Sequence, residues 1–519
     1  MTEERFALLS VSDKTGVADF GRRLVDVGFT ILSTGGTARA LSEAGVPVTK
    51  VSDFTGAPEI FNGRVKTLHP RIHGGVLGDR DKHAGEAEEQ GIRWIDLVAC
   101  NLYPFEETVS GDVDLATAVE NIDIGGPTMV RASAKNHRYV LSVTDPADYD
   151  RVAAALEGDG ADQSLRTELA LKAFQHTARY DSVISDWLGR QTASDTESTH
   201  FAEGAIGLRK VQDLRYGENP HQTAAFYADV EVTGRSLARA VQHQGKHMSF
   251  NNLADLDGAL RCVFEFDQPA CAIIKHMNPA GCATGPDIAT AFARALAGDP
   301  VSAFGGIVVF NRPVGPQDVF AVRSAKTFFE VLAAPGFTGD SLQRLSGRKN
   351  LRVLELPADW GESLPPGRDT RRVQGGWLVQ DWDVGVDYTF NVVTDRAPSP
   401  DEERALRFAW RTARNTKSNA IVFAKALADG ETLNGCGAGQ MSRVDSVKLA
   451  ISKATLPIEG CVMASDAFFP FADGPKAAID AGISAVIQPG GSVKDDEVIA
   501  AANAAGIAMV MTGHRHFRH

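Results

Sequence analysis

Short apolar runs that alternate with helix-like segments most constrain the fold of the first 200 residues. Four runs have the length and composition of buried strands, and they lie at 6–12, 29–34, 96–103 and 139–145. The segments 15–27 and 37–44, between runs, have helical patterns. Strands that alternate with helices predict a mostly parallel sheet covered on both faces. Because ligands bind beyond the carboxyl ends of such strands, we expect a site in the segments that follow these runs.

Residues that suit an anionic ligand follow three of these runs. They are Ser10, Ser12, Lys14, Thr34, Gly35, Gly36, Thr37, Asn101 and Tyr103. The glycine pair lets the backbone approach an anion, and Thr37 is expected to cap the next helix, whose first N–H groups suit a phosphate. An ordinary strand-to-helix turn is the alternative interpretation of this segment, and the pattern alone leaves both open.

Two further stretches bring groups that bind phosphate or transfer protons. The loop-like segment 63–70 and the segment 123–128 contribute Arg64, Lys66, Thr67, Asp123, Gly125 and Gly126. Pro127 stands near the expected start of a helix that carries Arg131 and Lys135 one turn apart on one face. For Arg131 and Lys135 the alternative is a solvated helix face.

These motifs, taken in order, resemble one known family. The strings are SVSDKTG, STGGTA, GRVKTLHP, NLYPF and IDIGGPTMVRASAKNH. They are similar to the IMP cyclohydrolase domain of the bifunctional purine-biosynthesis family that joins AICAR transformylase to IMP cyclohydrolase. The resemblance implies an N-terminal parallel-sheet α/β/α domain of the methylglyoxal-synthase-like type at 1–195. It also implies that Lys66, Tyr103, Asp123 and Lys135 transfer protons, while the remaining residues of these loops bind substrate.

The second half of the chain repeats a pattern of apolar runs. Runs at 272–275, 305–310 and 331–334 recur with similar spacing at 420–424, 460–465 and 485–488. We therefore expect two related α/β subdomains, at about 205–370 and 371–519, with a ligand cleft between them. Residues 190–204 are polar, small and aperiodic, which predicts the boundary before a second domain at 205–519.

A lysine and a histidine stand side by side at the end of the first of these runs. The run is interpreted as a buried strand that delivers Lys275 and His276 into a segment that Asn278–Pro279 is expected to turn away. A cation beside a titratable base is what a proton-transfer site needs. The alternative is that both side chains only cap a strand.

The motifs around this pair resemble the AICAR transformylase domain of the same family. They are RYGENPHQ, KHMNP, SAFGG, KSNAIV, GAGQMSRVDS, SDAFFPF and RHFRH. The resemblance implies a C-terminal domain of two duplicated cytidine-deaminase-like α/β subdomains. It also implies that His276 is the base for formyl transfer and that Lys275 stabilises the oxyanion or protonates the folate nitrogen. Asn419 would orient His276 or the formyl group.

Further residues of these motifs are expected to bind the nucleotide or the folate. They are Arg215, Tyr216, Asn251, Phe304, Gly305, Arg443, Asp466, Phe468, Phe469, Arg515, Phe517 and His519. Exposed aromatic rings would stack on a flat heteroaromatic ligand, whereas core packing is the alternative for Phe468 and Phe469. For the basic tail the alternative is a frayed terminus.

Composition argues against several classes of partner and chemistry. The net charge of -13 and the pI near 5.5 argue against a nucleic acid or an anionic membrane as partner. Six cysteines without a C-x-x-C pair indicate neither a disulfide framework nor a zinc site, and the zinc-deaminase pattern H-x-E…P-C-x-x-C is absent. We interpret the sequence as free of a signal peptide and of a membrane span, and we expect a cytoplasmic enzyme.

The resemblance implies two successive reactions and their ligands. A formyl group passes from 10-formyltetrahydrofolate, a co-substrate, to AICAR, and the product loses water to give IMP. No catalytic metal is implied, a homodimer is typical of the family, and binding of the monovalent cation of some relatives is left open. A nucleotide-sensing module and a scaffold of degenerate enzyme domains are the alternatives. A sensor would not require the proton-transfer set, and a degenerate scaffold should have lost Lys275 or His276.

Overall fold

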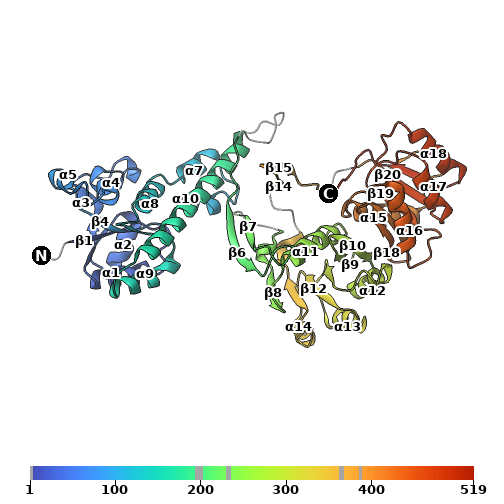
Figure 1. Cartoon of the computed structure of the whole chain (residues 1–519), viewed down its shortest axis with the longest axis horizontal. Coiled ribbons are helices and arrows are strands. Elements are labelled where there is room, and N and C mark those ends of the chain that lie inside the picture. Colours follow the sequence, from blue (N-terminus) through green and yellow to red (C-terminus); the bar gives the residue numbers. More distant parts are fainter. Residues whose placement is uncertain (1–3, 193–202, 230–234, 362–367, 385–387) are drawn as a thin grey trace. The chain divides into compact units, whose positions relative to one another are not determined.

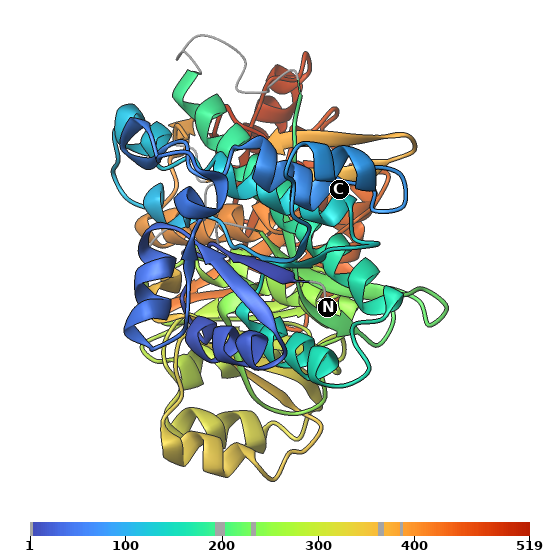
Figure 2. The same ribbon diagram turned by 90° about the vertical axis from the view of Figure 1, so that its left-hand side faces the viewer.

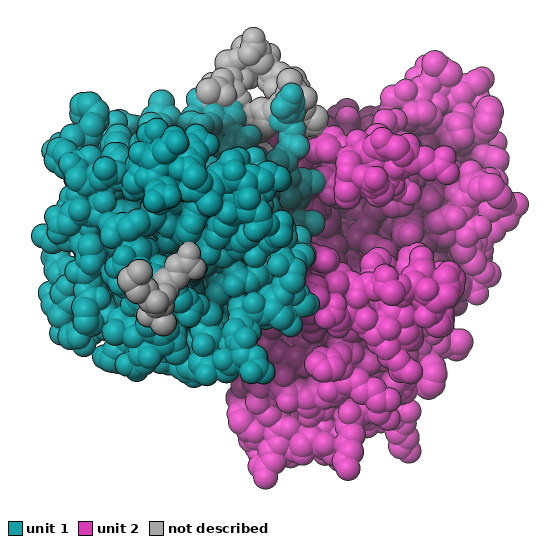
Figure 3. Space-filling view, turned by 60° about the vertical axis from the view of Figure 1, so that its left-hand side comes forward, with its two compact units in different colours: residues 1–209, 229–231 teal, residues 210–228, 232–519 magenta. Residues whose placement is uncertain are grey.

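The computed structural model describes residues 4–192, 203–229, 235–361, 368–384 and 388–519. The chain forms two compact units (Figure 3). Unit 1 comprises Met1–Arg209 and Asp229–Glu231, and unit 2 comprises Lys210–Ala228 and Val232–His519. Most of the predicted boundary segment 190–204 lies outside the described residues. Within the described ranges, no helix is both long enough and apolar enough to cross a membrane.

Unit 1 is a five-stranded sheet with helices on both faces (Figures 1 and 2). Its strand order is β3-β2-β1-β4-β5, and all neighbouring strands are parallel, as predicted. Its elements are β1 Arg5–Leu9, α1 Val17–Asp26, β2 Phe29–Ser33, α2 Gly35–Glu43, β3 Thr49–Lys50, α3 Val51–Thr55, η1 Phe61–Gly63, α4 Pro70–Leu77, α5 Ala84–Glu89, β4 Ile95–Ala99, α6 Phe105–Thr108, α7 Leu115–Glu120, α8 Gly125–Lys135, β5 Leu141–Val143, η2 Pro146–Asp148, α9 Tyr149–Glu157 and α10 Gln163–Thr192.

Two apolar cores, one on each face of the sheet, hold unit 1 together. Phe6 and Leu8 of β1 pack toward α3, α4, α8 and α10, whereas Ala7 and Leu9 pack toward α1, α2 and α9. Because both faces are covered, none of these four side chains is more than 2% exposed, and the strand is an uninterrupted apolar run in the sequence. The run turns polar at Ser10, directly after β1 ends, where the chain enters the edge predicted to bind a ligand.

Thr37 does not cap a helix, contrary to the prediction. Helix α2 begins at Gly35, so Thr37 lies in its first turn and is buried. Its hydroxyl accepts a hydrogen bond from the Val11 N–H at 3.0 Å and donates one to the Val11 carbonyl at 3.0 Å. Thr37 therefore binds α2 to the loop after β1. The local sequence did not show this contact, because the partner, Val11, lies in a different loop from the one that precedes α2.

Unit 2 is built on a 12-stranded mixed sheet in the order β16-β21-β20-β19-β17-β18-β10-β9-β11-β12-β13-β8. Two separate ribbons, β6-β7 and β14-β15, have two strands each. The elements from β6 onward are β6 Leu208–Leu214, β7 Ala224–Asp229, η3 Leu237–Arg239, β8 Val241–Gln244, α11 Phe250–Val263, β9 Ala270–Lys275, β10 Asn278–Thr284, α12 Ile288–Gly298, β11 Gly306–Phe310, α13 Pro316–Ser324, β12 Phe329–Ala334, α14 Gly339–Leu345, β13 Arg352–Glu355, η4 Ala358–Gly361, β14 Arg368–Val373, β15 Gly376–Asp381, β16 Asn391–Val392, α15 Pro400–Arg414, β17 Ile421–Leu427, β18 Gly430–Gly437, α16 Arg443–Lys453, β19 Val462–Ser465, α17 Asp473–Asp480, β20 Ala485–Gln488, α18 Asp495–Ala504 and β21 Ala508–Met511.

The large sheet consists of two copies of one pattern joined at β10 and β18. The first copy reads α11-β9-β10-α12-β11-α13-β12-α14-β13, and the second reads α15-β17-β18-α16-β19-α17-β20-α18-β21. The strand orders run outward in opposite directions from the junction, where β10 and β18 pair antiparallel (Figure 1). The predicted duplication is confirmed, since the runs at 272–275 and 420–424 lie in the equivalent strands β9 and β17.

The hairpin between β9 and β10 differs from the prediction. Asn278 and Pro279 are the first residues of β10, and the turn consists of His276 and Met277. The Asn278 side chain donates to the His276 carbonyl at 3.0 Å and accepts from the Lys417 N–H at 3.0 Å. These long-range contacts hold Asn278 at the start of the strand, although an Asn-Pro pair is by itself a turn signal.

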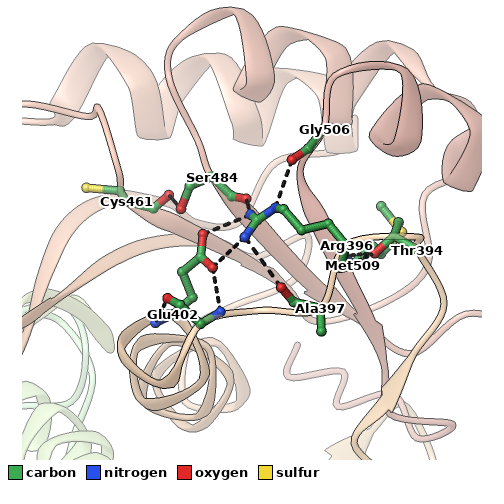
Figure 4. A network of polar contacts seen from close by, with 9 residues as sticks. Thr394, Arg396, Ala397, Glu402, Cys461, Ser484, Gly506 and Met509 are labelled. Carbon is green, nitrogen blue, oxygen red and sulfur yellow. Dashed lines mark hydrogen bonds and ion pairs between the residues drawn. The ribbon is translucent and has the colours of Figure 1, made fainter.

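Arg396 binds the segments that precede β20 and β21 in the second repeat. Its guanidinium makes two hydrogen bonds to Glu402, at 2.8 and 2.9 Å, and others to the carbonyls of Gly506, at 2.8 Å, and Ser484 (Figure 4). Glu402 also accepts from the Ser399 N–H at 2.8 Å, within the capping box that begins α15. This network lies away from the predicted site residues, which follow the carboxyl ends of strands.

Candidate functional sites

The carboxyl edge of the unit 1 sheet is shaped by Asn101. Its side chain accepts hydrogen bonds from the N–H groups of Ser12, at 2.6 Å, and Asp13, at 2.9 Å, and donates to the Asp13 carbonyl at 3.2 Å. The Ser10 N–H donates to the Ala99 carbonyl at 2.9 Å, which extends the pairing of β1 with β4. The loops after these two strands therefore form one rigid rim.

Two lysines converge on the amino terminus of α2. A Cβ atom placed on Gly35 would lie 3.3 Å from Lys66 Nζ, and one placed on Gly36 would lie 3.7 Å from Lys14 Nζ. Gly35 has a φ of 54°, in the left-handed region that favours glycine. The first N–H groups of a helix have no intrahelical partners, so together with two ammonium groups they make a site suited to a phosphate.

Glu59 is an acidic residue at this cradle that sequence reasoning missed. Thr34 Oγ1 donates to one Glu59 oxygen at 2.5 Å, and Lys66 Nζ lies 3.9 Å from the other. A phosphate bound here would compete with this carboxylate for the lysine. No spacing in the sequence signals the contact, because it joins residues of separate loops.

Asp123 stands on a loop fixed from several sides. Its carboxylate accepts from the Gly126 N–H at 2.9 Å, and its own N–H donates to the Tyr180 hydroxyl at 2.7 Å. A Cβ atom on Gly126 would lie 2.3 Å from Asp123 Oδ2, so a larger residue does not fit. Burial raises the pKa of Asp123, although hydrogen bonds from the N–H groups of Gly126, Tyr103 and Gly125 oppose it.

Two tyrosine hydroxyls belong to the surroundings of Asp123. Burial, and then the Asp123 charge, raise the pKa of Tyr103, which is still 51% exposed. Burial raises the pKa of Tyr180, on α10, to about 12. A carboxyl group with a raised pKa beside an accessible phenol is suited to proton transfer.

The remaining predicted residues of unit 1 lie at different places. Thr67 is buried, and its hydroxyl lies 3.4 Å from a Cβ atom placed on Gly125 at the start of α8. Arg64 is exposed and pairs with Glu120. Lys135 is exposed at the last residue of α8, which is about 15 Å of helix rise from its first residue. Within one chain, the structure does not bring Lys135 to the Asp123 loop.

In unit 2, Lys275 and His276 line a cavity of about 390 Å³ whose walls come from both repeats. Lys275 Nζ donates to the Phe304 carbonyl at 2.6 Å. Other polar lining residues are Asn278, Asp299, Ser302, Cys436 and Lys453. Both residues of the predicted pair thus line one cavity wall, which a pair that only capped a strand would not require.

A second pocket, of about 290 Å³, lies at the end of β18 and is lined by Ser418, Asn419, Gly439, Gln440, Met441, Phe517 and His519. The Lys417 carbonyl accepts from the Gly439 N–H at 2.8 Å, and the Lys417 N–H donates to Asn278 in the first cavity. The Ser418 N–H donates to the Arg518 carbonyl at 2.9 Å. The basic tail is therefore bound at the site edge, and it is not a frayed terminus.

Asn419 is held at both ends of its amide. Nδ2 donates to the carbonyls of Gln440, at 2.9 Å, and Met441, at 3.1 Å, and Oδ1 accepts from Arg443 at 2.7 Å. In this structure the amide has its partners inside the second repeat. This geometry does not support orientation of His276 by Asn419, and the other predicted role, orientation of the formyl group, stays a prediction.

Arg443 and Asp466 form a buried ion pair, with side chains that are 7% and 0% exposed. Arg443 also donates to the Ser465 hydroxyl at 2.7 Å, and Ser418 donates to Asp466. Both side chains are enclosed and paired with each other, and their contact with substrate stays a prediction. They hold the loop before β17 to the end of β19, a pairing that the sequence conceals because each residue stands in a separate motif.

Phe468 and Phe469 differ in environment. Phe469 is 1% exposed in the core, and its N–H donates to Gln488 at 3.0 Å, whereas Phe468 is 37% exposed. The predicted ligand contact of Phe469 is corrected, because its ring packs against the interior. Phe468 remains accessible to a ligand.

Other predicted residues of unit 2 are accessible. Phe304 and Phe517 are exposed, and the Arg515 guanidinium lies 4.6 Å from the centre of the Phe517 ring. Gly305 has a φ of 75°, which shapes the loop that presents Phe304.

The segment around Arg215 is tied to the start of α11. Arg215 is exposed, and its guanidinium lies 5.7 Å from the centre of the Tyr216 ring. Asn251, in the first turn of α11, donates to the Glu218 carbonyl at 3.3 Å. One helical turn later stands Asp255, which sequence reasoning also missed. The i,i+4 spacing with Asn251 is its one sequence signal.

Among the residues that the structure describes, no group of three or more His, Cys, Asp or Glu side chains is arranged to hold a metal ion. The arrangement offers instead an anion cradle with a carboxyl-phenol pair in unit 1, and an ammonium-imidazole pair on a cavity wall in unit 2.

Two family models match the chain. The model described as "AICARFT/IMPCHase bienzyme" matches residues 133–453, which is more than half of the chain, and the model described as "MGS-like domain" matches residues 16–128. A solved structure titled "Crystal structure of ForH" is 37% identical to this chain. The alignment covers 35% of this chain and 98% of that chain, with a TM-score of 0.33.

Proposed function

The chain belongs to the AICARFT/IMPCHase bienzyme family, a bifunctional enzyme of purine biosynthesis, and on that premise we propose that each unit performs one reaction. In unit 2 a formyl group passes from 10-formyltetrahydrofolate to the 5-amino group of AICAR. In unit 1 formyl-AICAR closes to IMP with loss of water. The observation that carries this proposal is the placement of Lys275 and His276 on one cavity wall of unit 2.

Formyl transfer needs two groups near the formyl carbon. One is a base that takes the proton of the attacking amino group, and the other is an electrophilic group that stabilises the oxyanion. The amino nitrogen of AICAR attacks the formyl carbon, and His276 takes the proton that the nitrogen releases. We assign stabilisation of the oxyanion to the Lys275 ammonium, which donates to the Phe304 carbonyl at 2.6 Å. The bond from the formyl carbon to the folate nitrogen then breaks, and that nitrogen takes up a proton to give tetrahydrofolate.

Ring closure uses the edge of unit 1. The cradle formed by α2, Lys14 and Lys66 supports binding of the 5′-phosphate. The carboxamide nitrogen attacks the formyl carbon, and the oxygen leaves as water after two proton transfers. Asp123, whose pKa is raised by burial, and Tyr103 are the groups we assign to these transfers.

We further propose that the exposed Arg215 and Arg515 bind the nucleotide of unit 2 and that folate serves as a co-substrate. The partners in both reactions are then small molecules. Neither reaction, as assigned, calls for a catalytic metal.

The test separates the two activities. We expect His276→Ala and Lys275→Ala each to lower formyl transfer by at least about 10²-fold, because each removes a group used in the transition state. Cyclisation of supplied formyl-AICAR should stay within about twofold, since unit 1 is untouched. His243→Ala is the matched control, because that histidine pairs with Glu355 on β13, away from the cavity lining. Equal loss of both activities in a folded variant would contradict the two-site division.

A further inference from the structure

The turn that carries His276 has an unfavourable backbone conformation. Lys275 pairs with Asn278, so the hairpin has a two-residue turn, and its residues His276 and Met277 have φ values of 52° and 62°. Such turns strongly favour Asn and Gly, which tolerate positive φ. A residue with a Cβ atom is sterically disfavoured in this region, and here two such residues stand in succession.

A carboxylate from outside the hairpin holds this conformation. Asp255, on α11, accepts hydrogen bonds from the His276 N–H at 3.2 Å and from the Met277 N–H at 2.7 Å. The His276 carbonyl accepts from the Asn278 side chain at 3.0 Å. Two adjacent N–H groups point at one carboxylate only while both residues keep this backbone conformation.

Helix α11 is close enough to act as a fixed support. A Cβ atom placed on Gly258 would lie 3.9 Å from the Met277 Cα. Gly258 is three residues after Asp255, and thus on the same face of α11. The helix is anchored by Leu256 and Leu260, which are 0% and 3% exposed in the main core of unit 2. Asp255 therefore connects the turn to one of the most enclosed elements of the molecule.

The conformation of the turn decides where the imidazole points. Rotation of the backbone at His276 swings its Cβ, and reacting groups displaced by about 1 Å lose large factors in rate. We propose that Asp255 is a positioning residue for formyl transfer, holding the His276–Met277 turn in the left-handed conformation from which His276 faces the cavity. This inference rests on the proposed function of His276.

The experiment combines loss of the carboxylate with relief of the strain. We expect Asp255→Ala to lower kcat for formyl transfer about 10²-fold, with KM for AICAR changed less than about threefold, because the substrate contacts remain. Asp255→Asn keeps one acceptor oxygen and should retain more activity than Asp255→Ala. Met277→Gly should stay within about twofold of the wild type.

The decisive variant is Asp255→Ala/Met277→Gly. Glycine adopts a φ of 62° without steric cost, so the double variant should recover at least about tenfold of the kcat lost in Asp255→Ala. A general structural role for Asp255 would give no such rescue. A double variant no better than Asp255→Ala would overturn the proposal, as would full activity of Asp255→Ala.

Two controls keep the outcomes distinct. Thermal unfolding of each variant shows whether unit 2 is folded. If Asp255→Ala does not fold, the same comparison is made between Asp255→Asn and Asp255→Asn/Met277→Gly. Wild-type formyl transfer by His276→Ala would refute the proposed function itself. Loss of activity in His276→Ala with none in either Asp255 variant would refute the positioning role alone.

Discussion

At the scale of single residues, the ring closure proposed for unit 1 depends on how Asp123 is enclosed. Burial disfavours its charged form, while three backbone N–H groups favour it, and the net effect raises its pKa. Its own N–H is satisfied by the Tyr180 hydroxyl. The position of the carboxyl group therefore depends on a tyrosine of α10, far along the chain from the loop that it supports.

Removal of that hydroxyl should weaken ring closure. In Tyr180→Phe the Asp123 N–H loses its acceptor, and leaving a buried donor unsatisfied costs about 1–3 kcal/mol. We expect kcat for cyclisation to fall about tenfold, with formyl transfer unchanged, measured separately with formyl-AICAR and AICAR. Tyr139→Phe is the matched control, because that hydroxyl donates to Asp79 and Asp81 at the surface. Equal cyclisation by both variants would show that Tyr180 does not position Asp123.

Residue identity alone could not assign several of the predicted roles. Tyr103 was found because it ends an apolar run that locates a strand, whereas Lys66 and Asp123 stand in loop-like motifs and their roles came from the family resemblance. Phe468 and Phe469 have the same side chain, and their different burial depends on the direction each takes from the backbone. Arg443 was interpreted as a ligand contact from its family motif, and the sequence did not show its buried ion pair with Asp466, which stands in a different motif.

At the scale of elements, the sequence predicts strands well and their connections less well. The strands predicted from apolar runs are buried on two faces, whereas the edge strands β8 and β16 are partly exposed and gave no run. A turn is set by long-range partners. The turn after β9 was placed at Asn278–Pro279, since the Asp255 carboxylate that stabilises His276–Met277 belongs to α11. Helix starts show the same limit, because Thr37 was expected to cap α2.

The contacts of Glu402 lie at the start of α15, and their contribution to stability can be tested. Burial opposes ionisation of Glu402, but hydrogen bonds from Arg396, the Ser399 N–H and Ser484 lower its pKa to about 2. A carboxyl group whose pKa is lower in the folded state stabilises the fold above its unfolded pKa, near 4.5, and loses this contribution as pH falls toward 2. After allowance for solvent screening near Arg396, the Glu402 carboxylate adds about 2 kcal/mol to the free energy of unfolding at neutral pH.

Glu402→Gln should therefore lower the thermal midpoint of unit 2 at pH 7. The difference from the wild type should shrink as the pH is lowered below about 4.5, measured by thermal unfolding in a pH series. Glu403→Gln is the control, because Glu403 pairs with Arg407 on the helix surface, where such pairs contribute about 0.3–0.5 kcal/mol. A difference that stays constant with pH would show that the charge of Glu402 does not stabilise α15.

At the scale of the whole molecule, duplication and division were both visible in the sequence pattern. The repeated runs of unit 2 correspond to equivalent strands around the β10-β18 junction. The cavity at that junction takes its walls from both repeats, and His276 stands where they meet. The proton-transfer groups proposed for unit 1 stand instead at the edge of a separate parallel sheet. The two proposed reactions therefore use different residues.

This independence predicts complementation between two defective proteins. Lys66→Ala should convert AICAR to formyl-AICAR and stop there, because it lacks a cation of the unit 1 cradle, whereas His276→Ala should cyclise formyl-AICAR that it cannot make. A mixture of the two purified variants, supplied with AICAR and 10-formyltetrahydrofolate, should form IMP after a lag in which free formyl-AICAR accumulates. A mixture of His276→Ala with Lys275→Ala, which lack the same activity, should form none. If the first mixture also forms no IMP while each variant keeps its remaining activity, the intermediate does not pass through solution, and the two units depend on each other within one molecule.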